Sequence, residues 1–71
     1  MTKRQARMLH LALDARARWI RGDTASDAAV LGELARMGFL HRRRTDAHFE
    51  YRPNIPAIKA ARQIGLLPEK P

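Results

Sequence analysis

The sequence predicts a small α+β domain, mainly helical, with the element order α-α-β-β-α and a two-stranded hairpin. Three observations predict this fold class. Apolar residues recur at helical spacing in two segments of the N-terminal half, and the second segment ends at a glycine. A basic segment and an alternating aromatic segment then read as the strands of a hairpin, and a segment led by proline predicts a last helix. We expect one domain over residues 1–71, with 67–71 as a frayed tail.

The first helix is expected over residues 3–21. On a helical wheel its apolar residues fall on one broad arc, which includes Met8, Leu11 and Trp19. Gly22 is expected to end this helix, because glycine readily adopts the backbone conformation of a helix C-terminus.

The second helix is expected to follow a short connector at residues 23–26 and to run to about Met37. Thr24 or Ser26 can cap its N-terminus by accepting a hydrogen bond from a first-turn amide. Gly38 ends it. The expected inner face consists of its apolar residues at helical spacing: Val30, Leu31, Leu34, Ala35 and Met37.

The hairpin is expected to begin after Gly38, to turn at residues 45–47 and to return through an alternating strand. Phe49 and Tyr51 share one face of that strand, and the alternation favours core packing for both rings. Pro56 suits the first turn of the last helix, which Gly65 ends.

The composition points to a polyanionic partner. Fourteen Lys and Arg against seven Asp and Glu give a net charge of +7, and most of the cations are arginine. Such a charge favours nucleic acid first and an acidic protein surface second, although a GC-rich genome would produce the same arginine and alanine content. The chain has no cysteine, no bilayer-length apolar run and no signal-like start, so a cytoplasmic protein without a membrane partner is expected. Homodimerisation is a further source of stability for so small a core.

From residue 31 to residue 65 the chain resembles the C-terminal part of small winged-helix (winged helix-turn-helix) proteins. The matching residues are Leu31-x-x-Leu34-x-x-x-Gly38-Phe39-Leu40, the basic strand, Tyr51-Arg52 and Pro56-Ala57-x-x-x-Ala61. Asn54 stands where the family pattern has threonine. The pattern departs in one respect: a separate short helix before the recognition helix is missing, unless the first helix breaks near Asp14 to supply it.

The resemblance implies that residues 27–36 form a recognition helix. The exposed positions expected there are Ser26, Asp27, Ala29, Gly32, Glu33 and Arg36. Two acids on that face oppose phosphates, so reading of base edges by this helix is disfavoured. Ser26 and Arg36 are expected to make secondary contacts.

The hairpin is the preferred nucleic-acid site. Its residues Arg42, Arg43 and Arg44 are expected to contact phosphates together with Arg52, with His41 and His48 nearby. A second cluster, Lys3, Arg4 and Arg7, is expected to clamp the backbone. The competing interpretation is a solvated basic edge strand that blocks aggregation.

We expect no enzyme, cofactor or metal site, because no nucleophile–base pair, glycine-rich loop or ligand cluster is present; His10 and Asp14 on one helix face do not make a site. The leading hypothesis is a bacterial or phage regulatory or accessory factor that binds double-stranded DNA. The alternative is a non-catalytic adaptor for an acidic protein, in which Glu33, Trp19 and Phe39 would form the contact.

Overall fold

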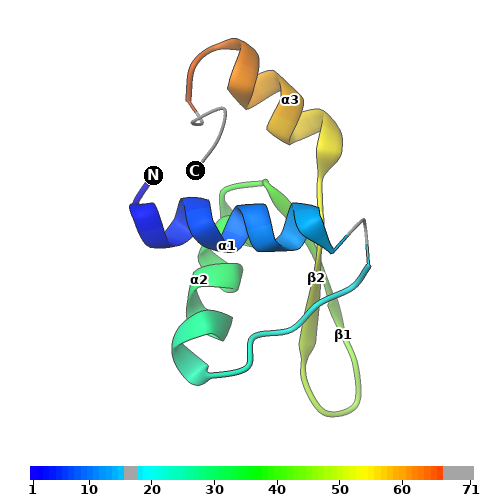
Figure 1. Ribbon diagram of the computed structural model, residues 1–71. Coiled ribbons are helices and arrows are strands. Elements are labelled where there is room, and N and C mark those ends of the chain that lie inside the picture. The colour runs from blue at the N-terminus through cyan, green and yellow to red at the C-terminus, as the bar shows by residue number, and fades with distance from the viewer. Residues whose placement is uncertain (16–17, 67–71) are drawn as a thin grey trace.

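A computed structural model of the chain describes residues 1–15 and 18–66 (Figure 1). The order of elements is α-α-β-β-α, so the predicted fold class is confirmed. The elements are α1 (Lys3–Asp14), α2 (Ala25–Arg36), β1 (Leu40–Arg44), β2 (Phe49–Pro53) and α3 (Ile55–Gln63). The expected tail at 67–71 lies outside the described residues.

Helix α1 is shorter than predicted, because it ends at Asp14 rather than at residue 21. It begins with a capping box in which the side chains of Thr2 and Gln5 each accept a hydrogen bond from the backbone N–H of the other residue. Further along, the chain is extended where Ile20 pairs with Tyr51 of β2 through two backbone hydrogen bonds of 2.8 and 2.7 Å. Pairing with a strand edge satisfies the same backbone groups that a longer helix would use, so Trp19 and Ile20 lie outside the helix.

Gly22 therefore does not end α1, contrary to the prediction. It lies against the first turn of α2, where a Cβ atom on Gly22 would come within 2.4 Å of the backbone nitrogen of Ala28. Glycine is required here by close backbone approach and not by a left-handed conformation. In the described residues 18–24 no helix precedes α2, so the first helix does not break to supply the missing element.

Helix α2 has the predicted ends. The Thr24 hydroxyl accepts a hydrogen bond from the backbone N–H of Asp27 at 3.1 Å, and Ser26, the other candidate cap, lies inside the helix. At the C-terminus Gly38 has φ +92°, and the N–H of Phe39 donates to the carbonyl of Leu34 in a Schellman motif. Leu34 is buried with Val30 and Leu31 as predicted, whereas Met37 is exposed.

Strands β1 and β2 form an antiparallel hairpin in which Leu40 pairs with Pro53 and Arg44 with Phe49. The four-residue loop 45–48 contains no glycine. Instead, the Thr45 hydroxyl accepts a hydrogen bond from the N–H of His48 and donates one to the His48 carbonyl. We call the side of the hairpin that carries Leu40 and Tyr51 the inner face, because both are buried against the helices, and the opposite side the outer face.

Helix α3 is capped by Asn54, the residue that follows Pro53 at the end of β2. The Asn54 side chain accepts from the N–H of Ala57 and also donates to the carbonyl of Gly38, so it links α3 to the end of α2. Gly65 (φ +78°) ends the helix as predicted, and Leu66 N–H donates to the carbonyl of Ala61 in a second Schellman motif.

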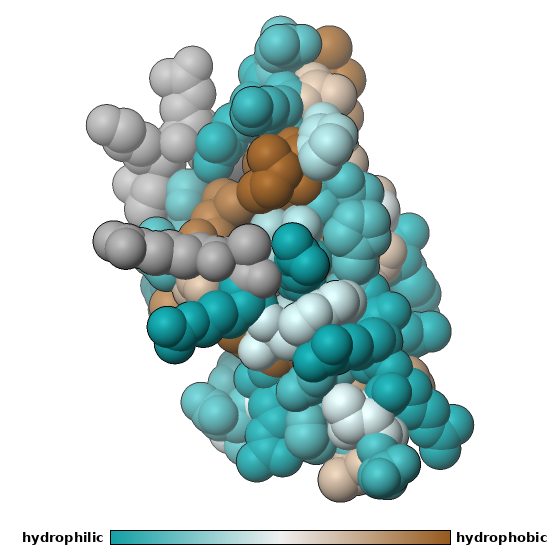
Figure 2. All heavy atoms as spheres, turned by 90° about the vertical axis from the view of Figure 1, so that its right-hand side faces the viewer, coloured by the Kyte–Doolittle hydropathy of each residue, from teal (hydrophilic) through white to brown (hydrophobic). Residues whose placement is uncertain are grey.

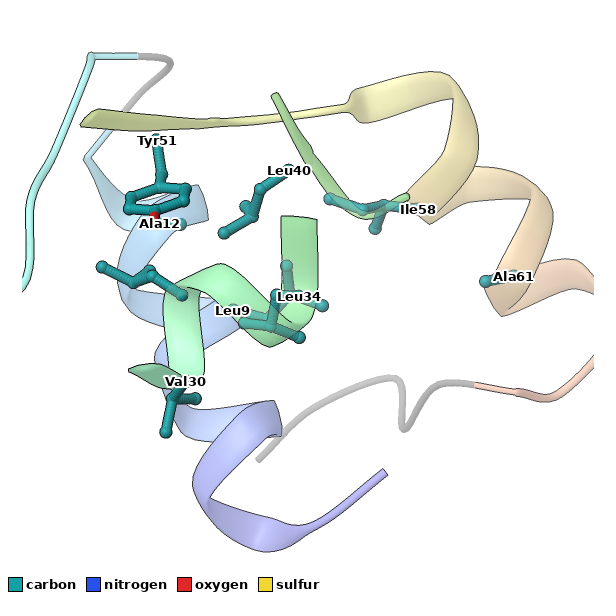
Figure 3. Close-up of a cluster of buried hydrophobic side chains, with 9 residues drawn as sticks. Leu9, Ala12, Val30, Leu34, Leu40, Tyr51, Ile58 and Ala61 are labelled. Carbon is teal, nitrogen blue, oxygen red and sulfur yellow. The ribbon is translucent and has the colours of Figure 1, made fainter. Parts of the chain in front are cut away.

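One apolar core joins all five elements (Figure 3). Its buried members are Leu9, Ala12, Val30, Leu31, Leu34, Leu40, Tyr51, Ile58 and Ala61. Leu11, predicted on the apolar arc of the first helix, is 54% exposed. None of the helices within residues 1–15 and 18–66 combines the length and the apolar character that crossing a membrane requires.

Candidate nucleic-acid interface

The distal half of the inner face carries Arg42, Arg44 and Phe49, which we call the distal inner cluster. The Arg42 guanidinium carbon lies 4.7 Å from the centre of the Phe49 ring, and that of Arg44 lies 5.9 Å from it. Phe49 is 42% exposed, whereas Tyr51 on the same face is 4% exposed. The prediction of core packing is therefore confirmed for Tyr51 and wrong for Phe49. In Figure 1 the hairpin stands to one side of α2, and its loop reaches beyond the lower end of that helix.

The outer face differs because Arg43 is already paired there. Arg43 Nε donates to Glu50 Oε1 at 2.8 Å, and the Arg43 guanidinium stacks on Trp19 at 4.3 Å from the ring centre. The three arginines were expected to act together, but the alternation of a strand places Arg43 on the side opposite to Arg42 and Arg44. The expected grouping of the three arginines is therefore corrected to Arg42 and Arg44 on one face and Arg43 on the other.

Glu50 is the centre of a polar network on the outer face. Its Oε2 lies 3.4 Å from His48 Nε2, and the Arg21 guanidinium lies 3.3 Å from His48 Nδ1. An arginine can only donate, so Nδ1 accepts from Arg21 and the Nε2–H faces Glu50. The hydrogen bond from Arg43 is the largest effect that holds the pKa of Glu50 below its ordinary value, with a smaller contribution from His48 and an opposing one from partial burial.

The cations of the inner face have no acidic partner among residues 1–15 and 18–66. The ion pairs found there use Arg4, Arg43 and His48, and none includes Arg42, Arg44 or Arg36. Arg36, at the end of α2, lines a shallow groove together with Arg42. Figure 2 shows that hydrophilic side chains dominate the half of this view that holds the hairpin, while apolar side chains gather toward the end that holds α3. Arg42, Arg44 and Arg36 are thus available to an anion.

Arg52 pairs in register with His41 and is exposed on the outer face, away from the distal inner cluster. It was predicted as a phosphate contact of the same surface as Arg42. The alternation of β2 separates these two positions in the same way that it separates Arg43 from its neighbours.

The solvent-exposed side of α2 carries mostly small side chains. Its two acids do not lie there, contrary to the expectation: Asp27 pairs with Arg4 at 3.7 Å, and Glu33 accepts a hydrogen bond from Gln5 at 2.9 Å, both from α1. The outward positions are instead held by the small residues Ala25, Ser26, Ala28 and Ala29, with Arg36 at the C-terminal end. Glu33 keeps its charge, because its partner Gln5 is neutral, and no long polar side chain along the middle of this side could reach a base edge.

The N-terminal cations form a group apart from the hairpin. Arg4 is hydrogen-bonded to Ser26 and paired with Asp27, so two residues predicted to bind phosphate contact each other instead. Lys3 and Arg7 are exposed on the same helix. Among the described residues no hydrogen bond or ion pair joins this group to β1 or β2.

Two contributors to the hairpin were missed by the sequence analysis. Trp19 was assigned to the first helix, and Arg21 was not considered as a partner of His48. No sequence signal marks either role, because both depend on the extended pairing of Ile20 with Tyr51.

Comparison of the chain with models of known protein families, with curated proteins and with solved structures finds no match. Within the described ranges 1–15 and 18–66, no three side chains of metal-binding type gather closely enough to hold an ion. What the hairpin presents is a set of guanidinium groups around an exposed aromatic ring. Guanidinium groups bind phosphate oxygens through paired donors, and an aromatic ring stacks on planar groups.

Proposed function

We propose that this protein binds nucleic acid, with double-stranded DNA as the first candidate, through the distal inner cluster of the hairpin. One observation carries the proposal: Arg42 and Arg44 flank an exposed Phe49 near the tip of the hairpin, and neither arginine is paired with a described acid. The planar donor fork of arginine fits phosphate oxygens, and phosphate contacts supply most of the affinity of non-specific binding.

The resemblance to winged-helix proteins supports the same proposal. In that interpretation β1 and β2 are the wing and α2 takes the place of the recognition helix. The hairpin loop and the N-terminus of α2 lie toward the same end of the molecule (Figure 1), so one duplex could meet both. The small outward residues of α2 favour a backbone contact by Arg36 over base reading, which fits an accessory or regulatory factor with weak sequence preference.

The proposal is tested by fluorescence anisotropy of a labelled random-sequence duplex, titrated with the protein from about 50 to 200 mM salt. If Arg42, Arg44 and Arg36 each neutralise one phosphate, log K should fall against log salt with a slope of about −2.7, from about −0.9 per phosphate. Absence of binding at the lowest salt, or binding with no salt dependence, would refute the proposal.

A protein adaptor for an acidic partner is the second candidate. The observation that favours it is the exposure of Ile64 (72%) and Leu66 (63%) at the end of α3, because large exposed apolar side chains suit a protein contact. Glu33 is less suited to this role than expected, since Gln5 already occupies its carboxylate. Under this proposal, Ile64→Ser with Leu66→Ser abolishes capture of the partner and leaves duplex affinity unchanged.

A further inference from the structure

We propose that Phe49 stacks on an unpaired base, so that the hairpin prefers single-stranded nucleic acid or the open end of a duplex to a continuous duplex. This inference rests on the proposed nucleic-acid binding and names the form of nucleic acid that the distal inner cluster takes. Its basis is the contrast between two rings on one strand face: Tyr51 is buried in the core, whereas Phe49 remains 42% exposed.

The surroundings of Phe49 are those of a stacking platform. Arg44 pairs in register with Phe49 and Arg42 lies one pair further along the same face, so both guanidinium groups lie close to the ring. Sites for single strands combine cationic side chains that hold the backbone with aromatic rings on which bases stack. Arg42, whose guanidinium is the nearer to the ring, can turn to a phosphate when a base takes its place.

The hairpin tip leaves room for the nucleotide beside the ring. A shallow hollow is lined by Arg44, the loop residues 45–48 and Phe49. The loop is held by the Thr45 hydroxyl, so the hollow has a defined edge. Inside a continuous duplex both faces of a base are covered by its neighbours, and a ring at the side of a hairpin meets base edges only. Stacking on Phe49 therefore requires an unpaired or terminal base.

Trp19 does not offer a second platform. The Arg43 guanidinium covers its ring, and Glu50 holds that guanidinium in place with a hydrogen bond of 2.8 Å. Phe49 and Trp19 therefore differ in whether their rings are available to a base. Because Trp19 is the chain's single tryptophan, it also reports on the outer face by fluorescence.

The experiment compares a labelled dT oligonucleotide with a labelled duplex, using the wild type, Phe49→Leu and Phe49→Trp. Leucine keeps an apolar side chain but cannot stack, and tryptophan keeps the platform. We expect Phe49→Leu to weaken oligonucleotide binding on the order of 5- to 100-fold, with less than about a twofold effect on the duplex, and Phe49→Trp to retain binding. Circular dichroism checks that both variants fold.

The outcomes separate this inference from the proposed function. If Phe49→Leu leaves oligonucleotide binding unchanged, or weakens both probes equally, stacking on an unpaired base is refuted. If Arg42→Ala with Arg44→Ala still removes duplex binding in that case, the proposed function stands without the stacking. If the wild type binds neither probe at low salt, both proposals fail together.

A spectroscopic readout tests the stacking directly. In the variant Trp19→Phe with Phe49→Trp, the single tryptophan lies at the proposed platform, whereas in the wild type it lies under Arg43 on the outer face. Adding the dT oligonucleotide should quench the fluorescence of the variant strongly and that of the wild type weakly. Equal quenching of the two proteins would overturn the assignment to Phe49.

Discussion

The two faces of the hairpin use the same residue type in opposite ways. On the outer face, Arg43 is engaged by Glu50 and Trp19. On the inner face, Arg42 and Arg44 lie close to Phe49, and no described acid pairs with them. Three consecutive arginines thus divide into one that braces the hairpin and two that are available to a ligand. The alternation of strand side chains makes this division, and it follows from the register and not from composition.

The comparison can be extended along the inner face, from its buried base to its exposed tip. Tyr51→Ala should have the largest effect on stability, about 3–5 kcal/mol, because it removes a buried ring from between β2 and the helices. Phe49→Ala should cost less, about 0.5–1 kcal/mol, since the ring lies outside the core and its removal loses mainly the contacts with Arg42 and Arg44. Urea unfolding followed by Trp19 fluorescence measures both. Similar losses for the two variants would show that the tip is also part of the folded core.

The division of the arginines is tested most directly by binding. Arg42→Ala with Arg44→Ala should lower duplex affinity by roughly 10-fold or more at about 100 mM salt, and the salt slope should become shallower by about 1.8, because two phosphate contacts are lost. The matched control is Arg43→Ala, which removes one positive charge from the adjacent position and should change the slope by less than about 0.5. An equal effect per arginine would mean that the hairpin acts through its net charge and that its faces do not differ.

The sequence predicted the elements of this fold well where local chemistry decides them. Gly38 and Gly65 end helices at the positions where glycine was expected to do so, and Val30, Leu31 and Leu34 form the expected inner face of α2. In each case the signal and its structural cause lie within a few residues of each other.

The predictions from the sequence were wrong where contacts between residues far apart in the chain determine the structure. The wheel pattern continued to residue 21, but pairing of Ile20 with Tyr51 takes that segment into an extended conformation. Likewise, periodicity placed Phe49 in the core with Tyr51, because it contains no information on how far the helices reach along the hairpin. Of the candidate site, the residue types were predicted, while their distribution between the two faces depended on the exact strand register.

Removing Arg43, which contacts Glu50 and Trp19 on the outer face, should have a smaller effect on stability than removing the buried ring of Tyr51. Arg43→Ala loses the stacking on Trp19, which contributes about 0.5–1 kcal/mol at an exposed site, and the exposed pair with Glu50 adds little. Thermal unfolding should show a melting temperature lowered by a few degrees, about 2–8 °C for a domain of this size. A change in Trp19 emission in the folded state should accompany it. An unchanged melting temperature and unchanged emission would show that the contacts of Arg43 with Trp19 and Glu50 do not stabilise the fold.

The pH dependence of stability tests the outer face separately from the inner face, because Glu50 lies on the outer face alone. Its folded-state pKa lies below the ordinary value of 4.5, chiefly through the hydrogen bond from Arg43. A lowered pKa stabilises the folded state above the unfolded-state value, and this contribution disappears as the pH falls through the folded-state pKa. The difference in stability between wild type and Glu50→Gln should therefore be largest near neutral pH and should shrink below pH 4.5.

The same variant also affects binding, in the direction opposite to its effect on stability. Glu50→Gln raises the net charge by one and replaces the charged acceptor of the Arg43 hydrogen bond with a weaker, neutral carbonyl, so duplex affinity should rise by up to about fivefold at low salt. Arg43→Ala combined with Glu50→Gln should cancel this gain, because the released guanidinium is then absent. The double variant has the same net charge as the wild type, so if it keeps the higher affinity, loss of the Glu50 carboxylate explains the gain and Glu50 does not restrain Arg43 from the ligand.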